Sequence, residues 1–255
     1  MNPAITDWRG KRVWLLGASS GIGAALAHEL LRRGARVALS GRKEALLRDV
    51  AGDAGSALVL HCDVRYPVSV QLAFEKLLDA WHGVDVALYL AAEYQPMRAW
   101  ELDLDTANRM IDVNLRGAVA FASNVVPCLI RQGGGQIAFV ASVAGYGGLP
   151  KSLIYGPTKA ALINFAEALY LDLSPKGIGV RIVNPGFVAT PLTAANDFRM
   201  PALMTPEAAA LATLHGFAGG AFEIDFPRRF TRVMKLVAML PYRSYFALVR
   251  RITGG

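Results

Sequence analysis

The strongest constraint on the fold is the alternation of short apolar runs with longer helical segments along most of the chain. Val13-Trp-Leu-Leu16 leads through a glycine turn into a helical segment from Ala24 to Arg33. Further strands are expected at residues 36–40, 57–61, 86–90, 136–140 and 180–183, with helices at 43–50, 68–81, 106–131 and 155–173. Such alternation forms right-handed βαβ units, and continuously apolar strands are typical of a sheet covered on both faces. The sequence therefore predicts an α/β fold around one parallel sheet.

Length and composition narrow the class of protein. A chain of 255 residues and 27.4 kDa fits one α/β domain or at most two small ones. Its 53% apolar and 18% charged residues exclude a disordered chain, and two cysteines are too few for a disulfide scaffold. The segment from Met1 to Arg9 has no signal-peptide pattern, and we find no apolar, uncharged run long enough to span a bilayer. We therefore expect a cytoplasmic protein without a membrane-spanning helix.

A glycine turn, Gly17-Ala-Ser-Ser-Gly-Ile-Gly23, separates the first strand from the first helix. A helix N-terminus has unpaired backbone N–H groups and a partial positive charge, so a glycine turn there can hold a pyrophosphate against bare backbone. The spacing is one variant of the dinucleotide fingerprint, and the alternative is an ordinary tight turn between strand and helix. The predicted cofactor contacts in this turn are Gly17, Ser19, Ser20, Gly21, Ile22 and Gly23.

The end of the second strand bears on the choice of nicotinamide cofactor. An acidic residue there would accept hydrogen bonds from a ribose 2′-hydroxyl, whereas an arginine would bind a 2′-phosphate. This chain has Ser40-Gly41-Arg42-Lys43 and no acid before Glu44, which favours NADP(H) over NAD(H), with Arg42 on the phosphate. The alternative is that Arg42 is a solvated residue at a helix start. Asp63, after the third strand, is placed to accept a hydrogen bond from the adenine amino group.

Four residues are candidates for catalysis. Tyr155 and Lys159 stand one helical turn apart and share a helix face, so the ammonium can lower the pKa of the phenol. Tyr155 is then a usable proton donor and acceptor. Ser142 follows a strand, where its hydroxyl can bond a substrate carbonyl oxygen, and Asn114 offers a buried amide to hold a water that relays protons to Lys159.

Over roughly residues 11–191, the sequence resembles the short-chain dehydrogenase/reductase family. The matching pieces are the glycine turn, Cys62-Asp63-Val64, Asn114, Ser142, Tyr155-Gly-Pro-Thr-Lys159 and Asn184-Pro185-Gly186-Phe187-Val188-Ala189-Thr190-Pro191. The resemblance implies a Rossmann-type, doubly wound domain and hydride transfer at a carbonyl or alcohol carbon. It also implies a catalytic tetrad of Asn114, Ser142, Tyr155 and Lys159. The further cofactor contacts that it implies are Val64, Ala91, Ala92, Tyr155, Lys159, Pro185, Gly186, Val188 and Thr190.

The chain departs from the family pattern in two places. Leu16 stands where a threonine is frequent, and Tyr89-Leu90-Ala91-Ala92 stands where the family often has Asn-Asn-Ala-Gly. The change at Leu90 removes a polar group that would brace the central strands, while backbone contacts to the cofactor there are expected to survive. The histidines and cysteines show no ligand spacing, so we predict no metal.

By the same resemblance, residues from Pro191 to about Met204 form a lid over the substrate. This lid is apolar and predicts a lipophilic ketone, aldehyde or alcohol as substrate; the alternative is that it packs on the core. Its apolar residues are Leu192, Phe198, Met200, Leu203 and Met204.

Residues 227–255 are expected to form a basic, amphipathic tail of two short helices broken at Pro241, attached to a catalytic domain at 1–226. Residues 1–225 hold 20 basic and 20 acidic side chains, so the whole net charge of +7 lies in the tail. Three roles stay open for it: attachment to the cytoplasmic face of a membrane, a wall over the substrate cleft, or a dimer contact. Without a recognised reader motif, the charge does not predict nucleic-acid binding.

The sequence thus supports two hypotheses of different classes. The first is an NADP(H)-dependent oxidoreductase, expected to be a homo-oligomer, with Tyr155 as general acid and base. The second is a non-catalytic, cofactor-binding regulatory or scaffold protein that docks through its tail.

Overall fold

Seven parallel strands form one sheet in the computed structural model, which describes residues 1–196, 198 and 200–253. Residues 197 and 199 of the expected lid and residues 254–255 of the tail lie outside the described residues. The strands are β1 (Arg12–Leu16), β2 (Arg36–Gly41), β3 (Ala57–His61), β4 (Val86–Tyr89), β5 (Gln136–Val140), β6 (Gly179–Pro185) and β7 (Glu223–Phe226). Their order in the sheet is β3-β2-β1-β4-β5-β6-β7. The predicted α/β class and the parallel sheet are confirmed.

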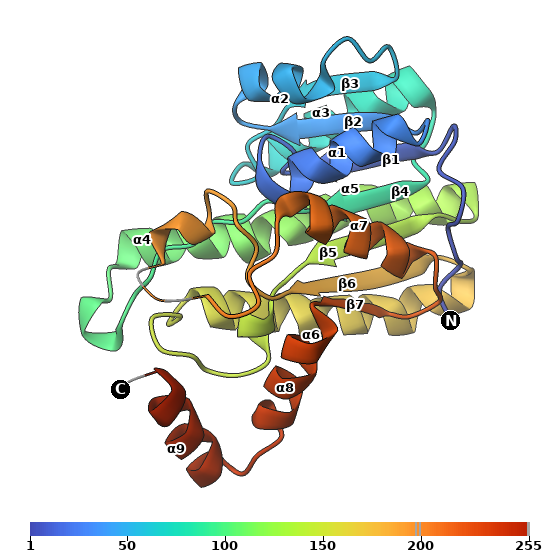
Figure 1. Ribbon diagram of the computed structural model, residues 1–255. Helices are drawn as coiled ribbons and strands as arrows, with labels where there is room; N and C mark the ends of the chain where they lie inside the picture. The colour runs from blue at the N-terminus through green and yellow to red at the C-terminus, as the bar shows by residue number, and fades with distance from the viewer. Residues whose placement is uncertain (197, 199, 254–255) are drawn as a thin grey trace.

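Helices cover both faces of the sheet (Figure 1). One face carries α1 (Gly21–Arg32), α2 (Glu44–Ala51) and α7 (Pro206–Phe217). The opposite face carries α3 (Pro67–Trp81), α4 (Leu104–Ile111), α5 (Gly117–Gln132) and α6 (Tyr155–Leu173). The strand order reverses between β1 and β4. Strand β1 lies between β2 and β4, and its Val13 pairs with Val37 on β2 and with Val86 on β4. A crevice opens at such a switch point beyond the carboxyl ends of the strands, and there this fold places its ligands.

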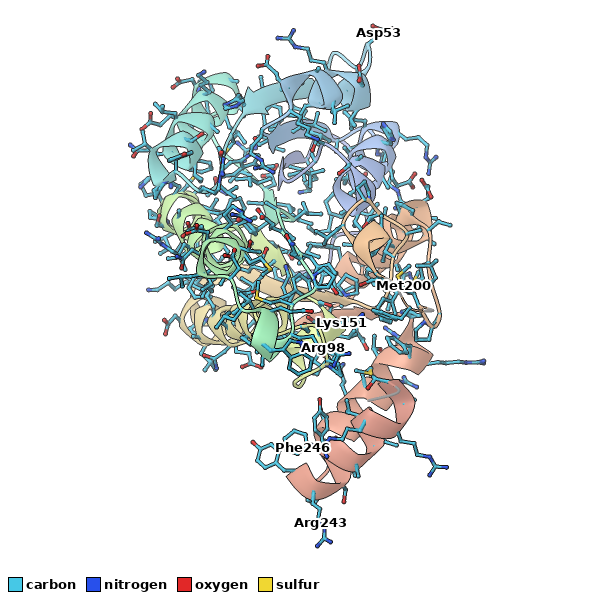
Figure 2. All side chains as sticks on the ribbon, turned by 90° about the vertical axis from the view of Figure 1, so that its left-hand side faces the viewer. Asp53, Arg98, Lys151, Met200, Arg243 and Phe246 are labelled. Atoms are coloured by element: carbon cyan, nitrogen blue, oxygen red, sulfur yellow. The ribbon has the colours of Figure 1, made fainter. Side chains whose placement is uncertain are left out.

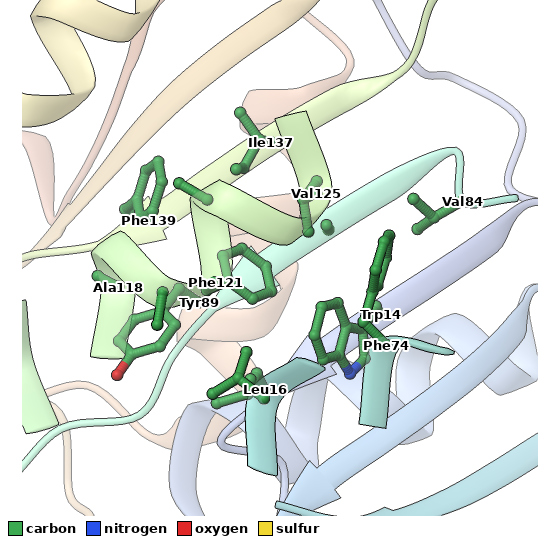
Figure 3. Packing of buried hydrophobic residues seen from close by; sticks show 14 of the residues in the cluster. Trp14, Leu16, Phe74, Val84, Tyr89, Ala118, Phe121, Val125, Ile137 and Phe139 are labelled. Carbon is green, nitrogen blue, oxygen red and sulfur yellow. The ribbon is translucent and has the colours of Figure 1, made fainter. Parts of the chain in front are cut away.

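The core between the sheet and α3 and α5 is aromatic. The Trp14 ring stacks on Phe74 with centroids 5.1 Å apart and meets Phe121 at 4.8 Å (Figure 3). Its indole Nε1 donates a hydrogen bond of 2.8 Å to Ser40 Oγ on β2, so the one polar atom of this buried ring is satisfied. The packing joins β1 and β2 to the helices on this face.

One helical segment is long and apolar enough to cross a membrane by composition, within the part of the chain that the structure describes. It runs from Leu104 to Gln132 through α4, a π-helical turn at Asp112–Arg116 and α5. Its apolar window has a mean hydropathy of 1.4, and 56% of that window is buried inside the protein. The apolar residues are therefore explained by packing in the core.

The predicted tail consists of two helices, α8 (Arg228–Ala238) and α9 (Tyr242–Thr253), separated at Pro241. They extend away from the sheet as a hairpin below β7 (Figure 1). The boundary predicted at residue 226 coincides with the end of β7, although α8 packs directly on the neighbouring loops.

A buried arginine, Arg181 on β6, ties three segments together at the opposite end of the sheet from the crevice. Its guanidinium is inaccessible to solvent and stacks on the Phe217 ring at 4.9 Å. Its N–H groups donate to carbonyl oxygens of Pro3, Gly216, Gly219 and Ala221 and to the side chain of Gln136. Burial lowers its pKa to about 10. Three of these carbonyl groups lie in the last turn of α7 or just after it, at the negative end of the helix dipole.

Arg181→Met is expected to lower the free energy of unfolding by about 3 kcal/mol, because the buried carbonyl groups lose their donors. Denaturant unfolding of Arg32→Met is the control, since Arg32 forms an exposed ion pair with Glu29 and its loss should cost less than about 0.5 kcal/mol. Equal losses for the two variants would contradict this role for Arg181.

Candidate active site

A cavity of about 750 Å³ opens at the carboxyl ends of the strands and joins the glycine turn to the Tyr155–Lys159 pair. Every residue predicted to contact the cofactor lines it: Gly17, Ser19, Ser20, Gly21, Ile22, Gly23, Arg42, Asp63, Val64, Ala91, Ala92, Tyr155, Lys159, Pro185, Gly186, Val188 and Thr190. Ser142 also lines the cavity, whereas Asn114 is not among its lining residues. Segments far apart in the sequence therefore meet in one place.

The glycine turn is tightly packed against the protein itself. A Cβ on Gly23 would lie 2.1 Å from the carbonyl oxygen of Gly17, and a Cβ on Gly17 would lie 2.4 Å from the backbone nitrogen of Ala91. Gly21 has φ of +55°, and a Cβ there would lie 2.9 Å from Thr190 Cγ2. These glycines were expected to let a pyrophosphate approach the bare backbone. In the structure, glycine is also required because any side chain at Gly17 or Gly23 would collide with neighbouring backbone atoms.

Tyr155 begins α6, and Lys159 follows one turn later on the same face, as predicted. Lys159 is 1% exposed, and its Nζ donates a hydrogen bond of 2.9 Å to the carbonyl oxygen of Val140 at the end of β5. That nitrogen lies 5.5 Å from the centre of the Tyr155 ring. Ser142 Oγ accepts a hydrogen bond of 3.2 Å from Ala144 N, which orients the hydroxyl beside Tyr155.

Burial shifts both titrating groups toward their neutral forms. It raises the pKa of Tyr155 to about 12, an effect that the hydrogen bond with Ser142 partly offsets. It lowers the pKa of Lys159 to about 7. Without a bound cofactor, the phenol is thus protonated at neutral pH, while the amine is near its titration point. Any negative charge placed in the cavity favours the ammonium form of Lys159.

Asn114 lies in the π-helical turn between α4 and α5 and is fully buried. Its Nδ2 donates to the carbonyl oxygen of Glu93 at 2.9 Å and to Thr158 Oγ1 at 3.1 Å, while its Oδ1 accepts from Glu93 N at 2.8 Å. Both amide hydrogens are therefore used by protein acceptors. These bonds fasten the loop after β4 to the catalytic helix. The role expected for the amide, holding a water for Lys159, stays a prediction.

The end of the cavity next to β2 and β3 is cationic. Arg42, Lys43 and Arg65 all line it, and sequence reasoning identified only the first as a ligand. Arg65 donates hydrogen bonds to both carboxylate oxygens of Asp63, and the bond from Nη2 to Oδ2 is 2.6 Å long. These bonds lower the pKa of Asp63. The predicted acceptor for adenine thus already has a partner. Arg65 lies only two residues after Asp63, a spacing that could have drawn attention to the pair.

Tyr94 closes the substrate side of the cavity and was also missed. Its ring meets the Tyr155 ring edge-on at 4.9 Å, and its hydroxyl donates a hydrogen bond of 3.0 Å to Asn196 Oδ1 in the expected lid. Phe198 of the lid packs against Phe187 at 5.7 Å yet remains 45% exposed. The described part of the lid therefore packs over the cavity and keeps some apolar surface in solvent.

The sheet with its switch-point crevice, together with a serine and a Tyr-x3-Lys pair facing that crevice, defines a nicotinamide-dependent oxidoreductase of the Rossmann type. The family model described as short chain dehydrogenase matches residues 11–199. The chain therefore belongs to the short-chain dehydrogenase/reductase family, whose members are NAD(P)-dependent dehydrogenases and reductases.

Similar proteins are consistent with this assignment. An oxidoreductase of Myxococcus xanthus (strain DK1622) is 34% identical over 240 residues, covering 92% of this chain and 95% of its relative. A 3-ketoacyl-(acyl-carrier-protein) reductase from Brucella melitensis, solved with NADH, is 28% identical with a TM-score of 0.78, covering 87% and 99% of the two chains. A Burkholderia cenocepacia J2315 short chain dehydrogenase, solved with NADP, has a TM-score of 0.84 at 24% identity, covering 96% and 99%, and shows the same fold.

Lys159→Met is expected to stabilise the cofactor-free protein, with a gain that depends on pH. Because the folded pKa of about 7 lies below the ordinary 10.5, the unfolded chain binds an extra proton between these values, so wild-type stability rises with pH across this range. The gain from the substitution should be largest below pH 7 and fade toward pH 10.5.

Denaturant unfolding at several pH values measures this gain, with Lys76→Met, at an exposed position on α3, as control. A gain that does not change with pH would show that Lys159 is not the titrating group.

Proposed function

We propose that this protein transfers a hydride between NADP(H) and the carbonyl or alcohol carbon of a small, lipophilic substrate, with Tyr155 as general acid and base. One observation carries the proposal: a single crevice links a glycine turn and a cationic end to Ser142, Tyr155 and Lys159. A non-catalytic scaffold would have no need to keep this set of groups together in one cavity.

The preference for NADP(H) is supported by the charges at the adenosine end. Arg42 and Lys43 follow β2, at the position where an acidic residue would repel a 2′-phosphate. Because Asp63 is engaged by Arg65, its negative charge is compensated locally. Similar proteins have been solved with NADH and with NADP, so the preference for NADP(H) is inferred from this chain's own cations.

In the direction of reduction, a nicotinamide held in this cavity would supply the hydride to the substrate carbon. The Ser142 hydroxyl donates a hydrogen bond to the carbonyl oxygen, and Tyr155 donates its proton to that oxygen as the alcohol forms. Lys159 in its ammonium form has three N–H donors, of which one bonds Val140 O. The residue lines the cavity, and its Nζ lies 5.5 Å from the centre of the Tyr155 ring. This positive charge favours the phenolate that remains after proton transfer.

An apolar substrate is supported by the side chains around the reacting end of the cavity. Tyr94, Val188 and Leu192 line it, and Phe198 lies on the lid side of Phe187. A lipophilic ketone, aldehyde or alcohol fits these surroundings better than a charged one. The cytoplasmic location and the homo-oligomer stay predictions.

Tyr155→Phe should abolish turnover while cofactor binding stays within about twofold, because only the exchangeable proton is lost. A panel of carbonyl and alcohol substrates followed by NADPH absorbance measures this, with Tyr170→Phe on the same helix as a matched control that retains activity. A Tyr155→Phe variant that remains active would rule out the assigned proton donor.

Arg42→Ala should weaken NADPH binding by roughly tenfold and change NADH binding little, since a charge-assisted hydrogen bond to a phosphate is lost. Titration of cofactor fluorescence gives both affinities, and Arg32→Ala, on the exposed end of α1, controls for a general loss of charge. Equal losses for the two cofactors would contradict a 2′-phosphate contact.

A further inference from the structure

The charge of this protein is concentrated in the two tail helices. Residues 226–255 carry all seven excess positive charges and no acidic side chain. Lys235 is used internally, since its Nζ donates to Glu223 Oε2 at 2.6 Å and to Asp225 Oδ2 at 3.3 Å on β7. The remaining six cations are exposed: Arg228, Arg229, Arg232, Arg243, Arg250 and Arg251. The tail therefore presents a cluster of arginines to solvent.

The tail is held to the body in a defined position. The Phe230 ring packs on Phe187 at 5.8 Å, and Lys235 pairs with β7 as described. On α9, the hydroxyl of Tyr245 donates a hydrogen bond of 2.7 Å to the carbonyl oxygen of Gly148, and Tyr245 and Val249 are buried. These contacts orient both helices, so the side chains that point away form a fixed outer surface.

That outer surface is strongly apolar between its arginines. Phe230 packs on the body, whereas Val233, three residues later on α8, is 55% exposed. Figure 2 shows Phe246 and Arg243 at the far end of the hairpin, away from the body. We call this the tail surface; its exposed apolar residues are Val233, Leu236, Met239, Leu240, Tyr242, Phe246 and Ile252.

We propose that the tail surface binds an anionic lipid bilayer. Apolar side chains that enter the interface between headgroups and acyl chains, flanked by arginines that meet anionic headgroups, are the elements of a peripheral membrane anchor. The neutral body adds no compensating net charge. The complementary partner is therefore a surface that is both negative and able to accept apolar side chains.

Charge and the lining of the cavity argue against the two other roles of the tail. In a symmetric dimer the same patch meets itself, so an acid-free tail would bring arginines against arginines. The cavity-lining residues run from Leu16 to Thr193, so the tail packs behind the loops of the site without forming its wall. Through Phe230 and Phe187, the tail is continuous with Phe198 of the lid, so membrane binding would hold the lid side near the lipid.

Vesicle sedimentation of the full-length protein tests the proposal. Wild type should sediment with mixed phosphatidylglycerol and phosphatidylcholine vesicles, much less with phosphatidylcholine alone, and less at high salt. The double variant Val233→Glu/Leu236→Glu should lose at least roughly tenfold in partitioning. The triple variant Arg229→Gln/Arg232→Gln/Arg243→Gln removes three charges. Its partitioning onto the anionic vesicles should fall roughly fivefold for each charge removed, while its partitioning onto phosphatidylcholine vesicles should not change.

Leu72→Glu, 52% exposed on α3, and Arg32→Gln are the matched controls and should sediment like wild type. All substituted side chains are exposed, and circular dichroism confirms that each variant is folded. The proposal is overturned if wild type stays in the supernatant, or if the Val233→Glu/Leu236→Glu variant sediments equally well. It is also overturned if analytical ultracentrifugation without lipid shows self-association that this variant removes, while vesicles bind neither protein, since the surface would then join two copies.

Discussion

The cofactor crevice depends on how closely the backbone approaches itself around the glycine turn. A side chain at Gly23 would collide with the Gly17 carbonyl, and one at Gly17 would collide with the backbone of Ala91. With both positions free of a Cβ, α1 can start immediately beside β1 while the chain leaving β4 passes against the turn. The N-terminus of α1 then points into the space between β1 and β4, where a helix dipole and free N–H groups can receive a phosphate.

A second constraint connects this crevice to the catalytic helix. Asn114 holds both backbone polar groups of Glu93 and the Thr158 hydroxyl, so one buried amide joins the loop after β4 to α6. Tyr155 and Lys159 belong to that helix, and Tyr94, next to Glu93, contacts the Tyr155 ring. The loop after β4, which departs from the family pattern at Leu90, is thus attached to the site through the backbone of Glu93. It does not need a polar side chain at position 90 for this attachment. This explains how the crevice persists with Leu90 in place of a polar residue.

Much of the fold and of the catalytic site was predictable from local spacing in the sequence. The glycine turn directly joins β1 to α1, and the Tyr155–Lys159 pair lies within one helix, so the local sequence pattern suffices to place both. Contacts between distant segments were not predictable: Arg181 finds its carbonyl partners near both Pro3 and Gly219, and Tyr94 bonds Asn196. For the tail, periodicity located the apolar positions, but only packing on Phe187 separates half-buried Phe230 from exposed Val233.

The central claim is that one continuous crevice holds the dinucleotide, from the cations after β2 to the Tyr155 hydroxyl. A crystal structure of the complex with NADP+ tests it most directly. The account predicts the 2′-phosphate against Arg42, the pyrophosphate at the N-terminus of α1, and the nicotinamide beside Tyr155 and Lys159. A 2′-phosphate turned into solvent away from Arg42, or a nicotinamide outside reach of Tyr155, would contradict it.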